Sequence, residues 1–516
     1  MRSRPSAVLP VAALLLLGAC GIDRTGSITS DSSLPRTTVA TTGTDTPSTG
    51  AIPALGPSTT LPERDVPVLQ WSSCGERLEC TTLVAPLDYF ATGTESVRLP
   101  VVRHLALKQD KRIGSLLVNP GGPGFGGTYL ARNAATIFTE EILDRFDVVG
   151  WDPRGTGESV PAIDCIDNYD PYFAIDPTPD STEERQAIID SAKSFADACA
   201  ERTGSLLGHV STQDSARDID LLRRALGEPE VSYFGFSYGS ELGASWATMF
   251  PDTVRAAVFD GAADPNASAA ESMIDQARGF EIAFNAFLAD CATKCSFPRG
   301  EDPGKAFDDL VTAIDANDYP TVDGRPRLNL GIMYTAVTNA MYATSLWPAL
   351  DAALNEARDG NGAALLRLND DYYQRRDNGT YGNEIEAFLA ITCADDRGPA
   401  TVEEIDAYSA RLREAAPRLG ASFEGGYACV FWPVESEPNL VITGRGAGPI
   451  VVIGTTNDPA TPLESSQKMT RSLEGGVLVK VTGNGHTGYT RSACAQKIVN
   501  RYLIDGEPPS AEVECG

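Results

Sequence analysis

Short apolar runs rich in β-branched residues alternate with stretches of helical periodicity along most of this chain, and that pattern restricts its fold more than any other feature. Runs of this kind are typical of strands buried on both faces of a parallel sheet. The expected strands cover residues 96–106, 115–119, 147–152, 231–236, 256–260, 450–455 and 477–482. The expected helices between them include residues 215–226, 242–250, 464–473 and 493–503. The alternation predicts an α/β fold with a mostly parallel central sheet that helices cover.

Residues 265–430 interrupt this alternation, because they contain helical patterns and few strand-like runs. The helices expected there cover residues 272–290, 304–316, 331–351, 362–373 and 401–415. An insert between two parts of such a sheet would lie over the carboxyl ends of the strands, where these sheets bind ligands. We therefore predict an inserted helical lid at 265–430 on a core built from residues 68–264 and 431–516. A separate helical domain unconnected with the site is the alternative.

The N-terminus has the pattern of a secretion signal. Arg2 and Arg4 precede an apolar stretch at 7–17 that is too short to span a bilayer. The four residues that end at Cys20 resemble a bacterial lipobox, in which the cysteine is acylated and becomes the mature N-terminus. We predict removal of residues 1–19 and a lipid anchor at Cys20 that holds the protein on the outer face of the cell membrane. A plain cleavage site with an incidental cysteine is the alternative.

Residues 20–67 are rich in Thr, Ser, Pro and Gly and lack apolar periodicity. Such a segment cannot bury enough surface to offset its ordering entropy, so we predict a disordered tether between the membrane and the folded part. The formal net charge of −28 argues against a basic face for nucleic acid or anionic lipid. No nucleic-acid partner is therefore expected.

When Cys20 is set aside, ten of the eleven cysteines remain, an even number in a chain predicted to be exported. They occur as near pairs along the sequence, so we predict local disulfides. The expected pairs are Cys74–Cys80, Cys165–Cys199, Cys291–Cys295, Cys393–Cys429 and Cys494–Cys515. A zinc site is the alternative, but the sequence has no C-x-x-C pair and its three histidines are scattered, so no metal is expected.

Ser237 lies in the motif Gly235-x-Ser-x-Gly239, directly after the expected strand 231–236 and before a helix that opens at Tyr238. Glycines on either side let the strand and the helix pass close together, so the serine can occupy a strained turn with its hydroxyl exposed. This context indicates a nucleophile elbow with Ser237 as the nucleophile. An ordinary strand-to-helix turn, in which Gly and Ser are also common, is the alternative.

A glycine-rich loop, Asn119-Pro-Gly-Gly-Pro-Gly124, follows the expected strand 115–119. Its glycines leave backbone N–H groups exposed at a strand end, as an oxyanion hole requires. The predicted donors are the amides of Gly122 and Tyr238, which would face the negative oxygen of a tetrahedral intermediate. A phosphate-binding loop is excluded, because no G-K-[ST] follows and the chain is predicted to be exported.

The sequence contains three histidines that could serve as the base. His104 lies in an expected strand and His209 in a polar loop, whereas His486 follows the last expected strand within a Gly-rich loop. From that loop an imidazole can reach over the edge of the sheet towards the serine. We therefore predict that His486 is the base.

Asp458 follows the expected strand 450–455 and would hold the imidazole in one tautomer. Taken alone it would be read as a turn residue before a proline. The chain order Ser237, Asp458, His486 is, however, the order of the triad in α/β-hydrolases. Thr461 either hydrogen-bonds the Asp458 carboxylate or caps the helix that follows.

A charged, Gly-rich turn follows the expected strand 147–152 and should lie beside the glycine-rich loop. We expect Asp152 and Arg154 to pair and to brace this turn. Neither residue is expected to act in catalysis, because both precede the elbow strand and the triad is already filled.

Five motifs in this order resemble the tripeptidyl aminopeptidase branch of the proline iminopeptidase-like serine peptidases, which are α/β-hydrolases. The motifs are Asn-Pro-Gly-Gly-Pro-Gly at 119–124, Trp-Asp-Pro-Arg-Gly-x-Gly-x-Ser at 151–159, Gly-x-Ser-Tyr-Gly at 235–239, Asp-Pro-x-Thr-Pro at 458–462 and Gly-x-Gly-His at 483–486. The likeness spans roughly residues 70–516. Proline iminopeptidases have His where this chain has Pro120, which favours the tripeptidyl branch.

The resemblance implies a cofactor-free serine peptidase that releases short peptides, tripeptides in this branch, from free N-termini through an acyl-enzyme. Such an enzyme needs a carboxylate to receive the α-ammonium group of the substrate. Asp395 is the first candidate, followed by Glu384, Glu386 and Asp396. Solvated acids are the alternative for each in so acidic a chain.

Two other functions remain open at the level of sequence. A carboxylesterase or lipase of the cell envelope could use the same triad, because fold and nucleophile do not set the substrate. A non-catalytic binding protein on a hydrolase scaffold is the other alternative, and the complete triad argues against it.

Overall fold

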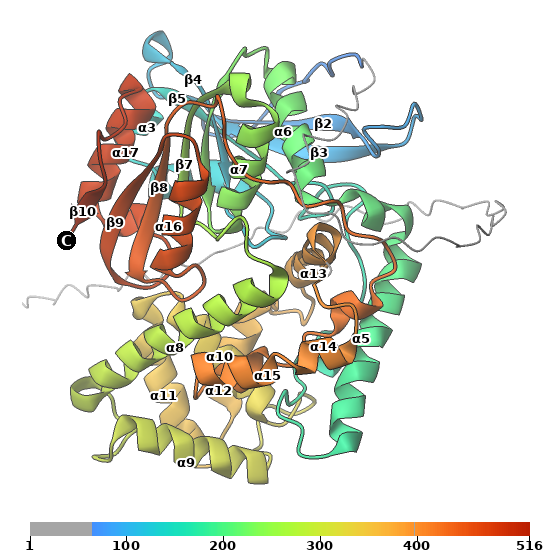
Figure 1. Ribbon diagram of the computed structural model, residues 1–516, viewed down its shortest axis with the longest axis vertical. Coiled ribbons are helices and arrows are strands. Elements are labelled where there is room, and N and C mark those ends of the chain that lie inside the picture. Colours follow the sequence, from blue (N-terminus) through green and yellow to red (C-terminus); the bar gives the residue numbers. More distant parts are fainter. Residues whose placement is uncertain (1–63, 397) are drawn as a thin grey trace, which may run out of the picture. The chain divides into compact units, whose positions relative to one another are not determined.

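A single mixed sheet dominates the part of the chain that the computed structural model describes, residues 64–396 and 398–516 (Figure 1). Its order is β1-β2-β3-β5-β4-β6-β7-β8-β9-β10. The bounds are β1 Ser72–Gly75, β2 Leu78–Pro86, β3 Ser96–His104, β4 Gly114–Asn119, β5 Phe146–Trp151, β6 Val231–Phe236, β7 Val254–Asp260, β8 Ile450–Asn457, β9 Gly476–Asn484 and β10 Val513–Cys515. β1, β2, β3 and β5 pair antiparallel, and the strands from β5 to β10 pair parallel. The predicted α/β fold with a mostly parallel sheet is confirmed.

The central strands are apolar throughout because both faces of the sheet are covered. All residues of β4, β5 and β6 are buried. Leu117 and Tyr233 belong to the core on one face, whereas Leu116 and Phe234 belong to the core on the other. Successive side chains of a strand point to opposite faces, so a strand with helices on both sides needs a continuous apolar run.

Helices from distant parts of the chain supply the two covers. One core includes residues of α6 (Thr212–Leu226), α7 (Tyr238–Met249) and α16 (Leu463–Ser472). The other includes residues of α1 (Thr128–Arg132), α3 (Glu140–Leu143) and α17 (Ala493–Asp505). The carboxyl ends of the parallel strands lie along one edge of this sheet, and helices pack on both of its faces.

The segment between β7 and β8 is helical and has an apolar core of its own. Its helices are α8 Ala269–Lys294, α9 Pro303–Ala316, α10 Leu330–Met341, α11 Trp347–Arg358, α12 Ala363–Tyr372, α13 Glu384–Asp395, α14 Val402–Asp406 and α15 Ser409–Ala415. Phe284, Phe307 and Val337 are among its fully buried residues. In Figure 1 α8 to α12 lie together beyond the ends of β8 and β9.

Two of the long helices expected in this segment are wrong, because each is divided into two shorter helices. The expected helix 331–351 is two helices, α10 and α11, and Pro348 lies in the first turn of α11, where it cannot donate a hydrogen bond back to α10. The expected helix 401–415 is divided into α14 and α15. Helix α13 is not among the helices expected from the sequence.

A second insert, which lies inside the predicted core part 68–264, packs against the helical stretch between β7 and β8, residues 261–449, which is named the lid segment. It contains α4 (Asp170–Phe173) and the long helix α5 (Thr182–Thr203). Arg185 of α5 forms an ion pair with Asp406 of α14. Arg325 of the lid segment bonds the carboxylates of Asp170 at 2.9 Å and Asp370 at 2.7 Å. The cover over the strand ends is thus assembled from two separate stretches of chain.

The five predicted disulfides are all present as predicted. Among the described residues no group of three or more His, Cys, Asp or Glu side chains could hold a metal ion. Nor does any described helix have the length and apolar character needed to cross a membrane. The predicted signal peptide 1–19, Cys20 and most of the predicted tether lie outside the described residues.

Candidate active site

Ser237 occupies a strained turn between β6 and α7. Its backbone has φ +54° and ψ −126°, a conformation that costs a non-glycine residue about 1–3 kcal/mol. A Cβ on Gly235 would lie 2.2 Å from the carbonyl oxygen of Gly239, and one on Gly239 would lie 2.8 Å from the Asn119 oxygen. Both glycines of the motif are therefore required by close backbone approach. The close backbone contacts around the turn hold Ser237 in this strained conformation at the strand end, as expected of an elbow.

His486 and Asp458 meet at the ends of β8 and β9. The Nδ1 atom of His486 lies 2.8 Å from Asp458 Oδ1 and 3.0 Å from Oδ2. The carboxylate is buried and also accepts N–H groups from Ala460, Thr461 and Thr487 at 3.1, 2.9 and 3.0 Å. These bonds fix the carboxylate, so the Nδ1 proton faces it and Nε2 is left as the acceptor.

The Nε2 atom of His486 is buried and has no hydrogen-bond partner among the described residues. A polar nitrogen in that state is poised for a proton from a reacting group. Ser237 and His486 both lie against the end of β7. Ser237 N–H donates to the carbonyl of Asp260 at 2.8 Å, and a Cβ on Gly261 would lie 3.1 Å from His486 Cε1.

Thr461 lies beside the Asp458 and His486 pair. Its hydroxyl is 3.3 Å from His486 Nδ1, while its amide bonds Asp458. Its hydroxyl caps no helix, since α16 shows no side-chain cap at its N-terminus. Thr461 thus contacts the histidine with its hydroxyl and the aspartate with its backbone.

The glycine-rich loop after β4 packs on the elbow. Gly121 N–H donates to Asn119 Oδ1 at 2.9 Å, and a Cβ on Gly121 would lie 3.0 Å from the Tyr238 nitrogen. In the described part of the chain neither the Gly122 amide nor the Tyr238 amide donates to a protein acceptor. The two predicted donors therefore remain available beside Ser237, as an oxyanion hole requires.

Asp260, which was not expected from the sequence, connects the Ser237 turn with the loop after His486. Its carboxylate is fully buried at the end of β7 and accepts the N–H groups of Gly488 and Tyr489 at 2.7 and 2.8 Å. Burial raises its pKa to about 6, an effect that the two N–H donors oppose. A charged residue that ends an apolar strand was the available signal, since carboxylates are rarely fully buried without specific partners.

The turn after β5 is braced differently from the prediction. Asp152 accepts the amides of Thr128 and Glu158, each at 3.0 Å, and among the described residues it forms no ion pair with Arg154. Arg154 is fully buried and makes two bonds of 2.8 Å to Asp218 of α6. The expected pairing was wrong because the helix that faces Arg154 supplies its own carboxylate, while backbone amides occupy Asp152.

The four candidate acids for the substrate amine lie in different surroundings. Asp395 is engaged by Thr212, whose amide and hydroxyl lie 2.7 and 2.6 Å from its oxygens. Glu386 accepts the amide of Cys165 at 2.7 Å, and Asp396 that of Ala269 at 3.0 Å. Burial, and next the charge of Glu241, raise the pKa of Asp395. These three acids have protein partners that already fill their acceptor positions in part.

Glu384 differs, because its carboxylate accepts no hydrogen bond from another described residue. It begins α13, and its carbonyl lies 2.2 Å from the point where a Cβ on Gly124 would stand. The first turn of α13 is thus in backbone contact with the oxyanion loop. Burial raises the pKa of Glu384, an effect that is opposed first by a hydrogen bond from its own backbone amide and next by the positive charge of Arg376.

A strained serine after β6, an aspartate after β8 and a histidine after β9 on this sheet define an α/β-hydrolase. A family model for the alpha/beta hydrolase fold matches residues 114–302, and one described as TAP-like protein matches residues 416–515. The chain is 36% identical over 455 residues to serine protease Hip1 of Mycobacterium tuberculosis, covering 84% of this chain and 87% of that protein. It belongs to the tripeptidyl aminopeptidase-like family of α/β-hydrolase serine hydrolases.

Other relatives carry two further names. Carboxylesterase B of Mycobacterium tuberculosis is 36% identical over 474 residues, which cover 87% of this chain and 90% of that protein. Tripeptidyl aminopeptidase of Streptomyces lividans is 28% identical over 471 residues, covering 87% and 86%. Relatives of similar coverage are thus named both as peptidases and as an esterase.

Proposed function

We propose that this protein is a cell-envelope serine aminopeptidase that releases short peptides, in the manner of a tripeptidyl aminopeptidase, from free N-termini. Ser237 attacks the carbonyl carbon while His486 Nε2 takes its proton, and Asp458 stabilises the imidazolium. The Gly122 and Tyr238 amides donate to the oxyanion. His486 then protonates the leaving amine, and water hydrolyses the acyl-enzyme by the same route.

The observation that carries the peptidase proposal is the state of Glu384. Glu384 carries a half-buried carboxylate without a donor from another described residue, and the backbone of the same residue contacts the oxyanion loop at Gly124. An α-ammonium group would supply the missing donors and a compensating charge. Asp395 is less suited to this task, since Thr212 already bonds both of its oxygens.

A panel of peptides with free and acetylated N-termini, alongside short-chain esters, tests the proposal. We expect cleavage only of the free peptides, and a Glu384→Gln variant should raise their KM while leaving ester hydrolysis unchanged. Glu403→Gln removes one exposed charge from the same segment and serves as the control. Equal cleavage of acetylated peptides would contradict the aminopeptidase proposal.

The mechanism has its own test. Ser237→Ala should abolish turnover in a folded protein, and Asp458→Asn should lower kcat by about 10⁴-fold because the histidine tautomer is no longer fixed. A fluorophosphonate probe should label the parent protein and not Ser237→Ala. Absence of labelling in the parent would favour the non-catalytic binding protein instead.

Carboxylesterase activity is the second candidate. We retain it because the alignment with the relative named carboxylesterase B covers 90% of that protein. The same triad would cleave an ester, and no α-ammonium would then be needed. Hydrolysis of esters together with no cleavage of any free peptide would establish this alternative.

We also propose that Cys20 is acylated and anchors the protein at the outer face of the cell membrane. The support is the sequence pattern of residues 1–20, a cationic start, a short apolar stretch and a small-residue lipobox. A Cys20→Ala variant should appear as soluble exported protein. A variant that stays with the membrane would refute the anchor.

A further inference from the structure

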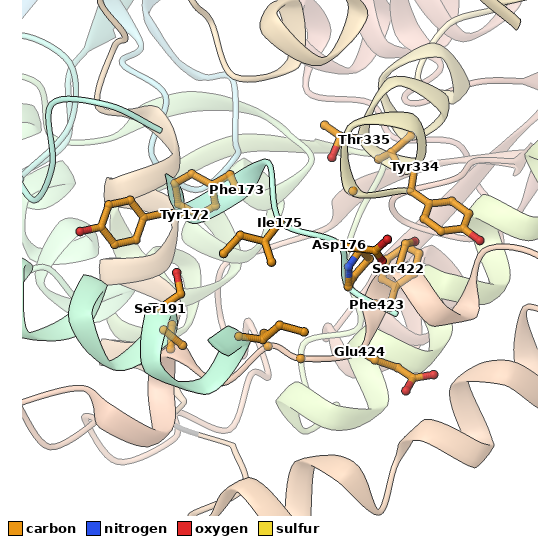
Figure 2. Close-up of a pocket in the computed structure, with 18 of the residues that line it drawn as sticks. Tyr172, Phe173, Ile175, Asp176, Ser191, Tyr334, Thr335, Ser422, Phe423 and Glu424 are labelled. Carbon is orange, nitrogen blue, oxygen red and sulfur yellow. The ribbon is translucent and has the colours of Figure 1, made fainter. Parts of the chain in front are cut away.

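A cavity of about 350 Å³ lies between the two inserts that cover the strand ends (Figure 2). Figure 2 shows Phe173 and Ile175 from the stretch before α5, with Tyr334 and Thr335 of α10 and Phe423 around the same space. The volume is near the lower end of the range of about 300–1,000 Å³ for small-ligand pockets. The cavity therefore suits a short segment of a substrate.

Tyr342 joins this cavity to the candidate active site. Its ring lines the cavity and stands edge-on to the ring of His486, with centroids 5.5 Å apart and planes at 82°. Its carbonyl accepts the backbone N–H of His486 at 2.9 Å. Leu389 of α13, the helix whose first turn packs on the oxyanion loop, lines the cavity as well.

A continuous series of aromatic rings leads from His486 into the cavity. Tyr342 contacts Tyr372 at 6.5 Å, and Tyr372 contacts Tyr373 at 5.2 Å between ring centroids. Tyr373 stacks on Phe173 at 5.4 Å, and Phe173 meets Phe195 of α5 at 5.7 Å. All five rings line the cavity. Rings fixed against one another offer aromatic faces and edges at little cost in conformational entropy.

The wall carries little charge that could recruit an ionic group. Burial raises the pKa of the Tyr342, Tyr372 and Tyr373 hydroxyls, so these side chains are neutral at working pH. Of the two acids in the lining, Glu424 is paired with Arg413 at 2.5 Å, whereas Asp176 accepts the neutral amide and hydroxyl of Thr178 and remains the one charge of the wall without an ion pair among the described residues.

We infer that this cavity receives the acyl part of the substrate and selects large aromatic or apolar side chains over small ones. The inference rests on the proposed serine hydrolase chemistry and adds the class of side chain to it. An aromatic side chain that fills the cavity replaces water with ring contacts along the series from Tyr342 to Phe195. A methyl group would leave most of this aromatic surface in contact with water.

Two matched substrate series test this inference. Tripeptidyl p-nitroanilides with free N-termini, which differ only by Phe or Ala at the third residue, give one comparison, and p-nitrophenyl esters of 3-phenylpropionate and acetate give the other. We expect kcat/KM to favour the aromatic member by on the order of 100-fold in the series that the enzyme cleaves, since one methylene alone is worth roughly 10–200-fold in a fitted pocket.

A cavity-filling variant separates selection by this cavity from selection elsewhere. Ser191 of α5 lines the cavity, and Ser191→Trp should cut the aromatic preference to within about 10-fold with little change for the small substrates. Ser194→Trp places the same side chain at an exposed position of the same helix, outside the lining, and should keep the preference.

The outcomes distinguish this inference from the aminopeptidase proposal. Equal rates for aromatic and small members in both series would overturn the inference, as would a preference that Ser191→Trp leaves intact. Cleavage of esters alone would refute the aminopeptidase proposal, and the ester series would still measure the aromatic preference.

Discussion

Asp260 holds the Ser237 turn with its backbone and the loop after His486 with its side chain. Its carbonyl accepts the amide of the proposed nucleophile Ser237, while its carboxylate accepts the amides of the second and third residues after His486. A displacement of this strand end would therefore move the serine and the histidine together. The geometry makes Asp260 a positioning residue, since its contacts are with the loops and not with a reacting atom.

An Asp260→Asn substitution should lower kcat by about 10- to 100-fold and change KM little. The amide has one oxygen acceptor and an NH₂ group that would face an N–H donor, so the histidine loop loses one of its two bonds. Steady-state kinetics and the rate of fluorophosphonate labelling measure the effect. An unchanged labelling rate would show that the loop does not depend on this carboxylate.

The same residue predicts a pH dependence of stability. Burial raises the pKa of Asp260 from its ordinary 3.8 to about 6, so the folded protein binds this proton more tightly than the unfolded chain. The contribution of Asp260 is therefore most favourable below pH about 4 and is lost as pH rises through about 6, by about 3 kcal/mol. Compared with the parent, Asp260→Asn should gain relative stability between those pH values, measured by urea unfolding. A constant difference would contradict the raised pKa.

At the scale of elements, the sequence predicts the strands better than the lid. The strand 231–236 was expected with the bounds that β6 has, because a run buried on both faces is apolar from end to end. Helix α13 escaped prediction, since acidic and apolar residues alternate around it without a clear apolar face. The role of Asp260 could not be predicted for another reason, because its partners are backbone amides of a loop more than two hundred residues away in the sequence.

The ion pair of Arg154 and Asp218 fixes the turn after β5 against helix α6. Both side chains are fully buried, and the Tyr89 hydroxyl donates to Asp218 at 2.7 Å. Asp218→Asn removes the nearer of the two carboxylates beside the buried Arg154 guanidinium and leaves Asp214 at 3.9 Å, so the free energy of unfolding should fall by about 3 kcal/mol. Chemical denaturation measures this change.

The control for that prediction is the pair of Lys193 and Asp197, which lies on the surface of α5 with both side chains more than half exposed. Lys193→Ala should change stability by less than about 1 kcal/mol. A similar effect of the two substitutions would mean that the buried pair does not brace the turn.

Considered as a whole molecule, the protein places its serine, aspartate and histidine on two stretches of chain that the lid segment separates. Neither stretch contains the site alone, because Ser237 lies in the first and Asp458 and His486 in the second. Motif order in the sequence predicts the three residues of the proposed triad, and the structure places each of them at the end of a strand, as expected. The sequence could not show that α5 joins the lid or that aromatic rings connect His486 to a cavity, since those contacts depend on how the inserts fold back.

The net charge of −28 leads to a prediction at this largest scale. A strongly negative molecule attracts a cationic peptide N-terminus over distances up to the Debye length, about 30 Å at 0.01 M salt and about 3 Å at 1 M. The value of kcat/KM for free peptides should therefore fall several-fold across that range, mainly through slower association, while hydrolysis of a neutral ester changes little. Stopped-flow binding to a Ser237→Ala variant isolates the association step. If peptide and ester rates fell in parallel, salt would be acting on the enzyme itself, and attraction of the charged N-terminus would be excluded as the cause.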